Sequence, residues 1–312
     1  MDKNKLIEFG LGGLAASGAG VFTNPLEVVK TRMQLQGELQ AVGKYTVHYK
    51  NSFHAFYIIG KTDGLLALQK GLVPAIYYQF VMNGFRLGTY QGLINAGLTQ
   101  DANGKVSFVR SVMAGAFAGC VGAFFGSPFY MVKTHLQSRS AQSIAVGTQH
   151  DHDSMLKGFR CVYSTGGFLG LWRGVSAAIL RVTVGSASQL STFSTSKAYI
   201  VHLQVFHAES WLNALAAAVM SGFVVTAFMT PFDVVSTRMY NQRTDARGKG
   251  HIYQNVLHCF VKIFQTEGLW GFYKGWAPSL MRLAPHTVLS LVFWDRLRDA
   301  YRRFQQHHPI EL

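Results

Sequence analysis

Apolar residues gather along this chain into long stretches that are separated by polar segments. A helix needs about 20 apolar residues to cross the roughly 30 Å of hydrocarbon in a bilayer. Stretches of suitable length are Phe9–Leu26, Leu72–Leu98, Val106–Met131, Val175–Val205, Trp211–Val235 and, approximately, Trp276–Trp294. The pattern therefore predicts an all-α membrane protein with six transmembrane helices.

Short amphipathic stretches lie in the polar segments between the two spans of each successive pair, near Phe53–Ile59, Met155–Tyr163 and Val256–Phe264. Helices with one apolar face lie in the plane of the membrane interface. The loops that hold them carry more Lys and Arg than the opposite side, so they should face the more negative compartment. An even number of spans then brings both termini to the other side.

Three prolines divide the chain into equal parts. Pro128 lies 103 residues after Pro25, and Pro231 lies 103 residues after Pro128. A fixed period of this kind indicates one structural unit used three times. The repeats are 1–103, 104–206 and 207–312, which together form one transmembrane domain with threefold pseudosymmetry. A proline inside a helix removes a hydrogen bond and bends the axis, so we expect kinks at Pro25, Pro128 and Pro231.

The composition supports a membrane protein over a soluble one. Of 312 residues, 49% are hydrophobic and only 14% are charged, with a formal net charge of +14. The three cysteines have unrelated spacings, which argues against a disulfide framework or a zinc site. A run of metal-ligand types, 150–153, is expected in a solvated loop. The sequence thus predicts no metal, cofactor or nucleic-acid partner.

Two motifs recur in each repeat. The first contains Pro25, Glu27 and Lys30; Pro128, Tyr130 and Lys133; and Pro231, Asp233 and Ser236. The second, about 40 residues further on, runs from Asp63 to Gly71, from Gly166 to Gly174 and from Glu267 to Gly275. Together they resemble the signature of the mitochondrial carrier family, solute carrier family 25, over essentially the whole chain.

This resemblance implies a multi-pass transporter of the mitochondrial inner membrane rather than an enzyme. It further implies a monomer whose termini face the intermembrane space and whose short amphipathic helices face the matrix. Within the family, the chain is most similar to the branch of oxaloacetate and sulfate carriers. Its substrate would be a small anion, moved by alternating access and in exchange for another.

A matrix gate is also implied by the resemblance. In the family, the acid that follows each proline pairs with the base of the next repeat and seals the cavity on the matrix side. Carried over to this chain, Glu27 pairs with Lys133 and Asp233 pairs with Lys30.

The third pair of the matrix gate would join Tyr130 to Ser236, where both charges are missing. Removing one member of a buried ion pair costs about 3–5 kcal/mol, whereas replacing both can be nearly neutral. The joint loss therefore supports the cyclic pairing. Gln34 and Gln137, one turn beyond the bases, are expected to brace two of the links.

An opposite, cytoplasmic gate would lie near the other end of the even-numbered spans. Its expected members are Gln91, Ser194, Asp295, Lys197 and Arg298. Next-repeat pairing of these residues forms no complete ion pair. We therefore predict that this gate closes with little electrostatic help.

The resemblance places the substrate at the middle of the even-numbered spans, which here carry Tyr78, Arg181 and Arg282; Arg86 lies two turns from Tyr78. An Arg at a bilayer centre costs at least about 2.5–3.5 kcal/mol, so it needs water or a partner. The aligned positions carry no acid, and the planar guanidinium suits a carboxylate or sulfate. An anionic substrate is the favoured partner; the alternative is neutralisation by backbone carbonyls or by the gate acids.

Neighbouring positions narrow the type of anion. Val182 follows Arg181, which by the resemblance disfavours a nucleotide or an amino acid and leaves a dicarboxylate, an oxo acid such as oxaloacetate, or a sulfate-type oxyanion. Tyr78 and Gln189 are expected to add hydrogen bonds. His286 would line the site or couple a proton to transport.

Lipid contacts are expected where Gly71, Gly174 and Gly275 start helices beside cations, because exposed backbone N–H groups make anion sites. The resemblance implies cardiolipin phosphates at these places. Two other functions stay open: a proton or anion leak of the uncoupling type, and a membrane adaptor that uses the carrier scaffold without transport.

Overall fold

The computed structural model describes residues 3–41, 43–101, 107–202, 211–243 and 250–307, and within these ranges it contains helices and no β-strand. The long helices are α1 (Lys3–Leu35), α3 (Leu72–Asn95), α4 (Phe108–Ser138), α6 (Val175–His202), α7 (Trp211–Asn241) and α9 (Trp276–His307). The short helices are α2 (Ser52–Thr62), α5 (Met155–Gly170) and α8 (Val256–Glu267), with 3-10 turns η1 (Leu65–Gln69), η2 (Gln142–Ile144) and η3 (Leu269–Tyr273). The predicted all-α class and the three short helices are confirmed.

Two of the described helices are apolar and long enough to cross a membrane by themselves, in the ranges Val109–Ser138 and Val219–Asn241. A third span would require α5 and α6 to be counted together, although they meet at an angle of 79°. Six membrane spans therefore stay a prediction. The expected limits at Val106 and Val205 lie outside the described residues.

The helices that contain the motif prolines continue well past them, which the hydrophobic pattern did not predict. α1 ends at Leu35 instead of Leu26, and α4 and α7 also extend beyond their prolines. Proline removes only its own N–H group, so a helix can resume if later residues are well packed. Val28, Val29 and Leu35 are fully buried and supply that packing for α1.

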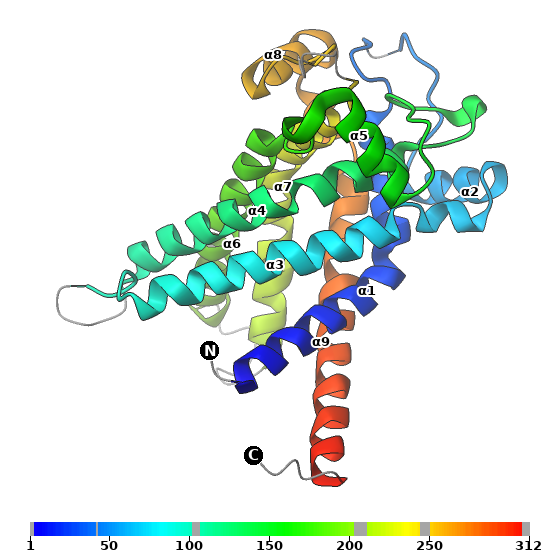
Figure 1. The fold of residues 1–312 in the computed structure, drawn as a ribbon. Coiled ribbons are helices and arrows are strands. Elements are labelled where there is room, and N and C mark those ends of the chain that lie inside the picture. The colour runs from blue at the N-terminus through cyan, green and yellow to red at the C-terminus, as the bar shows by residue number, and fades with distance from the viewer. Residues whose placement is uncertain (1–2, 42, 102–106, 203–210, 244–249, 308–312) are drawn as a thin grey trace.

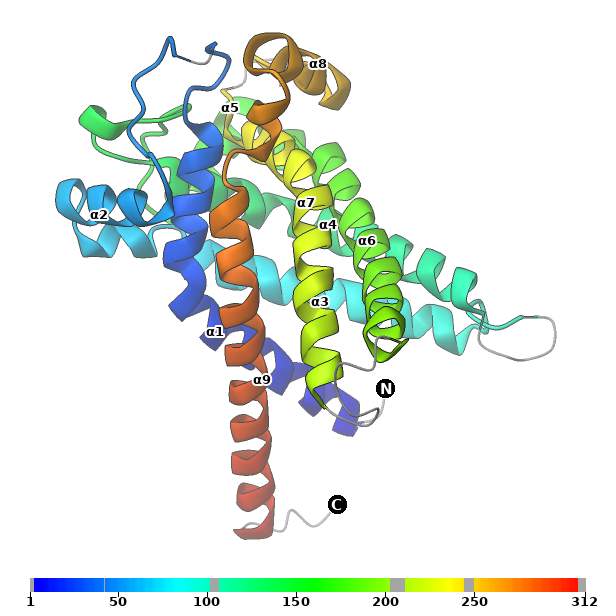
Figure 2. The same cartoon turned by 180° about the vertical axis from the view of Figure 1, so that it is seen from behind.

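The short helices α2, α5 and α8 lie together at one end of the molecule, and both chain ends point toward the opposite end (Figures 1 and 2). Asn51, Ser154 and Asn255 begin these helices by accepting a backbone N–H with their side chains. The most extensive helix packing joins α3 to α4, α6 to α7, and α1 to α9. Because the last helix packs on the first, the long helices close into a ring.

Candidate substrate cavity and matrix gate

A cavity of about 160 Å³ lies inside the ring, and residues from all six long helices line it. Its charged lining residues are Glu27, Lys30, Lys133, Arg181 and Arg282. The cavity lies beside the motif prolines, nearer the short helices than the chain ends. A charged space of this size can hold a small polar molecule or ion.

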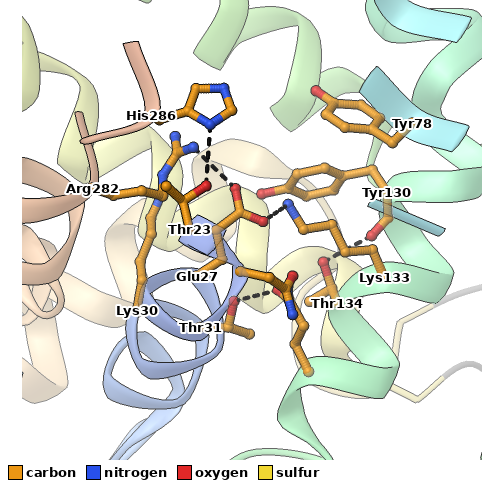
Figure 3. Close-up of polar contacts among 12 residues, drawn as sticks. Thr23, Glu27, Lys30, Thr31, Tyr78, Tyr130, Lys133, Thr134, Arg282 and His286 are labelled. Carbon is orange, nitrogen blue, oxygen red and sulfur yellow. Dashed lines mark hydrogen bonds and ion pairs between the residues drawn. The ribbon is translucent and has the colours of Figure 1, made fainter. Parts of the chain in front are cut away.

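Two ion pairs close the cavity toward the short helices. Lys30 Nζ lies 2.7 Å from Asp233 Oδ2 and joins α1 to α7, while Lys133 Nζ pairs with Glu27 Oε2 and joins α4 to α1. Figure 3 shows Glu27 between the end of Lys133 and the guanidinium of Arg282. The structure thus brings together both charged pairs that the resemblance of the motifs implied.

The same carboxylates also hold the two cavity arginines. Arg181 Nη1 lies 3.5 Å from Asp233 Oδ1, and Arg282 Nη1 lies 3.3 Å from Glu27 Oε1. The expectation that these arginines have no counter-charge in the protein is wrong; the alternative, neutralisation by the gate acids, is present in this structure. The sequence favoured an anionic substrate as the partner because these acids belong to other helices, at positions that an alignment of even-numbered helices does not contain.

Tyr130 and Ser236 do not form the expected third pair, because each side chain has different surroundings. The Tyr130 ring packs against Tyr240 and Tyr78 with centroid distances of 5.0 and 5.1 Å, and the Arg181 guanidinium lies 5.2 Å from its centroid. Ser236 Oγ is buried and has no hydrogen-bond partner in the described part of the chain. Aromatic packing and a cation–π contact replace the ion pair here.

The two glutamines of the gate connect neighbouring repeats. Gln137 Oε1 accepts from Thr31 Oγ1 at 2.9 Å, and its Nε2 donates to Asn24 Oδ1 at 3.2 Å. Gln34 Oε1 accepts from Thr237 Oγ1 at 2.8 Å. Both amides therefore link neighbouring repeats at the gate, as expected. Their partners are Thr31, Asn24 and Thr237, which lie near the charged residues, and not the charged residues themselves.

Three glycines at the starts of α3, α6 and α9 pack against the brace positions. Their φ angles are positive. An added Cβ would lie too close, at 2.8 Å, to Gln137 Cγ at Gly71 (+73°) and to Gln34 Cγ at Gly275 (+78°), and would make a tight contact of 3.1 Å with Tyr240 Cδ1 at Gly174 (+85°). Glycine is thus required at these positions by backbone conformation and by close packing. This packing is independent of any bound lipid.

Tyr78 and His286 line the cavity, as the sequence predicted for the substrate site. Arg181 Nη2 donates to the Tyr78 hydroxyl at 2.9 Å. His286 Nδ1 lies 3.1 Å from Thr23 Oγ1, and Figure 3 shows this bond on the Arg282 side of Glu27. These groups position both arginines and add hydrogen-bonding capacity around them.

Three other residues expected at the substrate site do not line this cavity. Val182 is buried against α4, where an added Cβ on Gly119 would come within 2.8 Å of its side chain. The backbone of Arg86 packs closely on Gly122, also in α4, and Gln189 is exposed. Helix rotation explains the difference, since residues a few positions from a lining residue turn toward a neighbouring helix.

Two contacts of the expected cytoplasmic gate lie within single helices. Gln91 Nε2 donates to Asn95 Oδ1 at 2.9 Å, and the Arg298 guanidinium lies 5.2 Å from the Trp294 ring centroid. Asp295 is exposed. The side chains of two other expected members, Ser194 and Lys197, are not among those that the structure describes. Weak electrostatic closure of this gate stays a prediction.

A second layer of ion pairs lies outside the cavity and was not predicted. Arg32 Nη1 lies 2.8 Å from Asp63 Oδ2, while Arg238 donates to both oxygens of Glu267 at 2.5 and 2.9 Å. Burial alone would raise the pKa of the Glu267 carboxyl, but hydrogen bonds from Arg238 and Lys274 keep it below its ordinary value. The signal was present in the sequence: an Arg seven residues after the proline, and the acid that begins the second motif.

Among the described residues, long helices from three repeats close around a charged cavity, which is the architecture expected of a membrane transport protein. The family model described as "Mitochondrial carrier protein" matches residues 2–98, 104–204 and 207–305. The chain belongs to the mitochondrial carrier family, whose members are transporters and not enzymes and are typical of the mitochondrial inner membrane. The resemblance of the motifs is thereby confirmed.

Among its relatives, solute carrier family 25 member 35 of Homo sapiens is 56% identical over 296 residues, which cover 95% of this chain and 98% of the relative. The mitochondrial oxaloacetate transport protein of Saccharomyces cerevisiae is 40% identical over 299 residues, with 94% and 89% covered. The mitochondrial citrate transporter E of Aspergillus niger is 39% identical over 297 residues, with 94% and 93% covered. The two reported relatives that are named for a substrate, oxaloacetate or citrate, are thus named for a carboxylate.

Proposed function

We propose that this chain carries a small dianion across the mitochondrial inner membrane by alternating access, in exchange for a second anion. The observation that carries the proposal is the charge of the cavity. Four cations line it, Lys30, Lys133, Arg181 and Arg282. They pair with two carboxylates, those of Glu27 and Asp233. The surplus of two positive charges matches a dicarboxylate, an oxo acid such as oxaloacetate, or sulfate.

Sharing of carboxylates suggests how substrate binding is coupled to opening of the gate. Each gate acid serves a lysine and an arginine at once, so an anion that reaches Arg181 and Arg282 competes directly with Asp233 and Glu27. The substrate then supplies partners to the cations as the gate acids move away. This replacement lowers the cost of separating buried charges, which is otherwise several kcal/mol for each ion.

Geometry favours an anion with two separated acidic groups. The two arginines approach the cavity from α6 and α9, and each presents a planar fork that suits bidentate binding of a carboxylate or sulfate oxygen pair. The relatives named for oxaloacetate and citrate transport also support a carboxylate. Tyr78 and His286 then supply hydrogen bonds to the remaining oxygens.

The test is uptake into liposomes by the purified protein, with labelled dicarboxylates, oxo acids, sulfate and phosphate offered in turn. Saturable uptake of a dianion should require an anion inside, and it should fall at least tenfold in Arg181→Gln and Arg282→Gln. Arg160→Gln, at an exposed position of α5, is the matched control and should transport normally. Absence of saturable uptake, or normal uptake by both cavity variants, would falsify the proposal.

The same assay separates the other two functions. A leak of the uncoupling type would show proton or anion flux without any internal anion, and an adaptor would show no flux while its melting temperature stays that of a folded protein. Arg181 and Arg282 line the cavity and can bind an anion there, which favours transport over the adaptor function. Proton coupling by His286 would make uptake of the dianion respond to a pH gradient, and His286→Gln should remove that response.

Orientation and lipid binding belong to the same proposal. We place the short helices on the matrix side and both termini in the intermembrane space, in a monomer. Cardiolipin phosphates would bind at the first turns of α3, α6 and α9, where backbone N–H groups are unpaired by the helix. Added cardiolipin should then raise the melting temperature of the protein more than phosphatidylcholine does.

A further inference from the structure

Three histidines meet at the outer face of the second repeat. His135 belongs to the end of α4, and His150 and His152 belong to the loop that follows it; one ligand nitrogen from each lies within 4.8 Å of the others. They line a cavity of about 240 Å³ that is separate from the substrate cavity. His152 is only 5% exposed, so the expectation of a fully solvated loop is wrong at this residue. The loop folds back and delivers its imidazoles to α4.

Hydrogen bonds determine which ring nitrogens are available. His135 Nε2 lies 2.8 Å from the carbonyl oxygen of Tyr240, and His150 Nε2 lies 2.9 Å from that of Asn241. A carbonyl only accepts, so both Nε2 atoms carry the hydrogen when the rings are neutral, and both Nδ1 atoms present lone pairs. Metal-binding histidines are oriented by bonds of this kind.

Several of the cluster's nitrogens are buried without a partner. Among the described residues, His135 Nδ1 and both ring nitrogens of His152 have no hydrogen bond. Native proteins leave few buried polar atoms unsatisfied, and a bound ion is one of the standard reasons for such atoms. Since His135 Nε2 is already bonded to α7, its free Nδ1 is the atom that faces the loop histidines.

The cluster also occupies the place where the other repeats have a cation and its acid. Arg32 and Arg238 each donate their Nε–H to a carbonyl of the next helix, as His135 does with Nε2–H. Their acids are Asp63 and Glu267, but the second repeat has Gly166 at that position. The second repeat thus lacks both charges and brings two additional imidazoles to the same level of the structure.

We propose that His135, His150 and His152 form a binding site for a divalent first-row metal ion, and that Zn²⁺ is the ion that fits it. Three imidazoles and one open position are a common ligand set for zinc, and imidazole disfavours Ca²⁺ and Mg²⁺. The rings of His135 and His150 are stacked with centroids 3.6 Å apart, so they tilt when both lone pairs meet one ion. Asp151 and Cys161 line the same cavity, and either of them, or a water molecule, can take the fourth coordination position of the ion.

A bound ion would connect α4 to the loop and, through the carbonyls of Tyr240 and Asn241, to α7. This is the boundary where the gate has no ion pair. Zn²⁺ on this side of the membrane should therefore hold the gate closed and slow exchange. That effect rests on the proposed transport function, whereas metal binding itself does not.

Calorimetric titration of Zn²⁺ into the purified full-length protein, freed of any histidine tag, tests the site. One ion should bind per chain, and His150→Gln and His152→Gln should each weaken binding at least tenfold. Zn²⁺ should raise the melting temperature of the wild type but not of His152→Gln. Because His152 makes no hydrogen bond within the described structure, its replacement should leave the fold intact.

His48→Gln is the matched control, since His48 lies in the corresponding loop of the first repeat. It should bind Zn²⁺ as the wild type does. Binding that survives both His150→Gln and His152→Gln overturns the site, and so does equal loss in the control. Failure of transport with normal Zn²⁺ binding would count against the proposed function alone.

Discussion

The boundary between α4 and α7 differs from the two boundaries that α1 makes with α4 and α7. At the α1 boundaries, Glu27 meets Lys133 and Lys30 meets Asp233. At the α4–α7 boundary, Tyr130 packs on Tyr240, whose hydroxyl lies 2.8 Å from Ser127 Oγ. Three equivalent helix contacts are therefore held by two ion pairs and one neutral aromatic cluster.

The difference shows that charge was lost in matched positions. Both members of the gate pair are absent between the second and third repeats, and the second repeat also lacks both members of the outer pair. A single buried charge without a partner is much more costly than a neutral replacement of both. This boundary is held by ring packing and by the neutral hydrogen bond between Tyr240 and Ser127, so its strength should depend least on salt.

Loss of Glu267 should have the largest effect on stability. Glu267→Gln leaves Arg238, which is fully buried, without a carboxylate, and the expected cost is about 3–5 kcal/mol at pH 7. The pKa of this carboxyl is lower in the fold than its ordinary value of 4.5, so its contribution is complete above about pH 4.5 and is lost as the pH falls through the folded value.

Thermal unfolding from pH 8 to pH 3.5 checks this prediction. The melting temperature of Glu267→Gln should be well below that of the wild type at pH 7, and the two should converge at the acidic end. A difference that stays constant over the whole range would show that the ionised carboxylate is not responsible. Asp153→Asn, at an exposed carboxylate, is the control.

Loss of Glu27 should have the next largest effect, because the cavity gives its partners some access to water. Glu27→Gln leaves Lys133 and Arg282 without their carboxylate, and we expect a loss of about 1.5–3 kcal/mol, as for hydrogen bonds to charged groups. The double variant Glu27→Gln with Lys133→Gln should recover part of that loss. A double variant that is less stable than Glu27→Gln would argue against the pairing. Melting temperatures of the three proteins give the comparison.

Converting the α4–α7 boundary to the charged type tests the comparison directly. Ser236→Lys buries an ammonium group that has no acid opposite it, so this variant should be less stable than the wild type. Adding Tyr130→Asp should restore stability and slow exchange, because it completes a third ion pair. Unfolding temperature and exchange rate in liposomes are the measurements. If the double variant is less stable than both single ones, positions 130 and 236 do not face each other across the gate.

Removal of one neutral hydrogen bond should have the smallest effect. Tyr240→Phe keeps the ring that packs on Tyr130 but loses the bond to Ser127, for a cost of about 0.5–1.5 kcal/mol. High salt should not change this difference, whereas it should reduce the effect of Glu27→Gln. Tyr163→Phe, at an exposed position of α5, serves as the control and should have a wild-type melting temperature.

Much of the gate was predictable because its logic is local in each repeat. The family's pairing, carried over to Glu27, Lys30, Lys133 and Asp233, identified both ion pairs. The pairing of Tyr130 with Ser236 followed the same logic and was wrong, since an aromatic ring found better packing among other rings. Spacing identifies which positions face each other, but it does not decide which rotamer a neutral side chain adopts.

The cavity shows the same limit for charged groups. Arg181 and Arg282 were correctly expected to need partners, and Tyr78 and His286 line the cavity beside them. Their partners are the gate acids, which come from helices in other repeats. Val182 was expected at the same site, but the rotation of α6 turns it toward α4.

The sequence by itself determined the three repeats and the helical class, because periodic spacing and binary patterning are local properties of the chain. The resemblance of its motifs indicated the family and the two ion pairs. Only the tertiary structure decided that each gate acid serves an arginine as well as a lysine. It also decided that His135 meets the loop histidines where the other repeats carry an Arg and an acid. Both results depend on how helices rotate and how one loop folds back, which packing between distant segments controls.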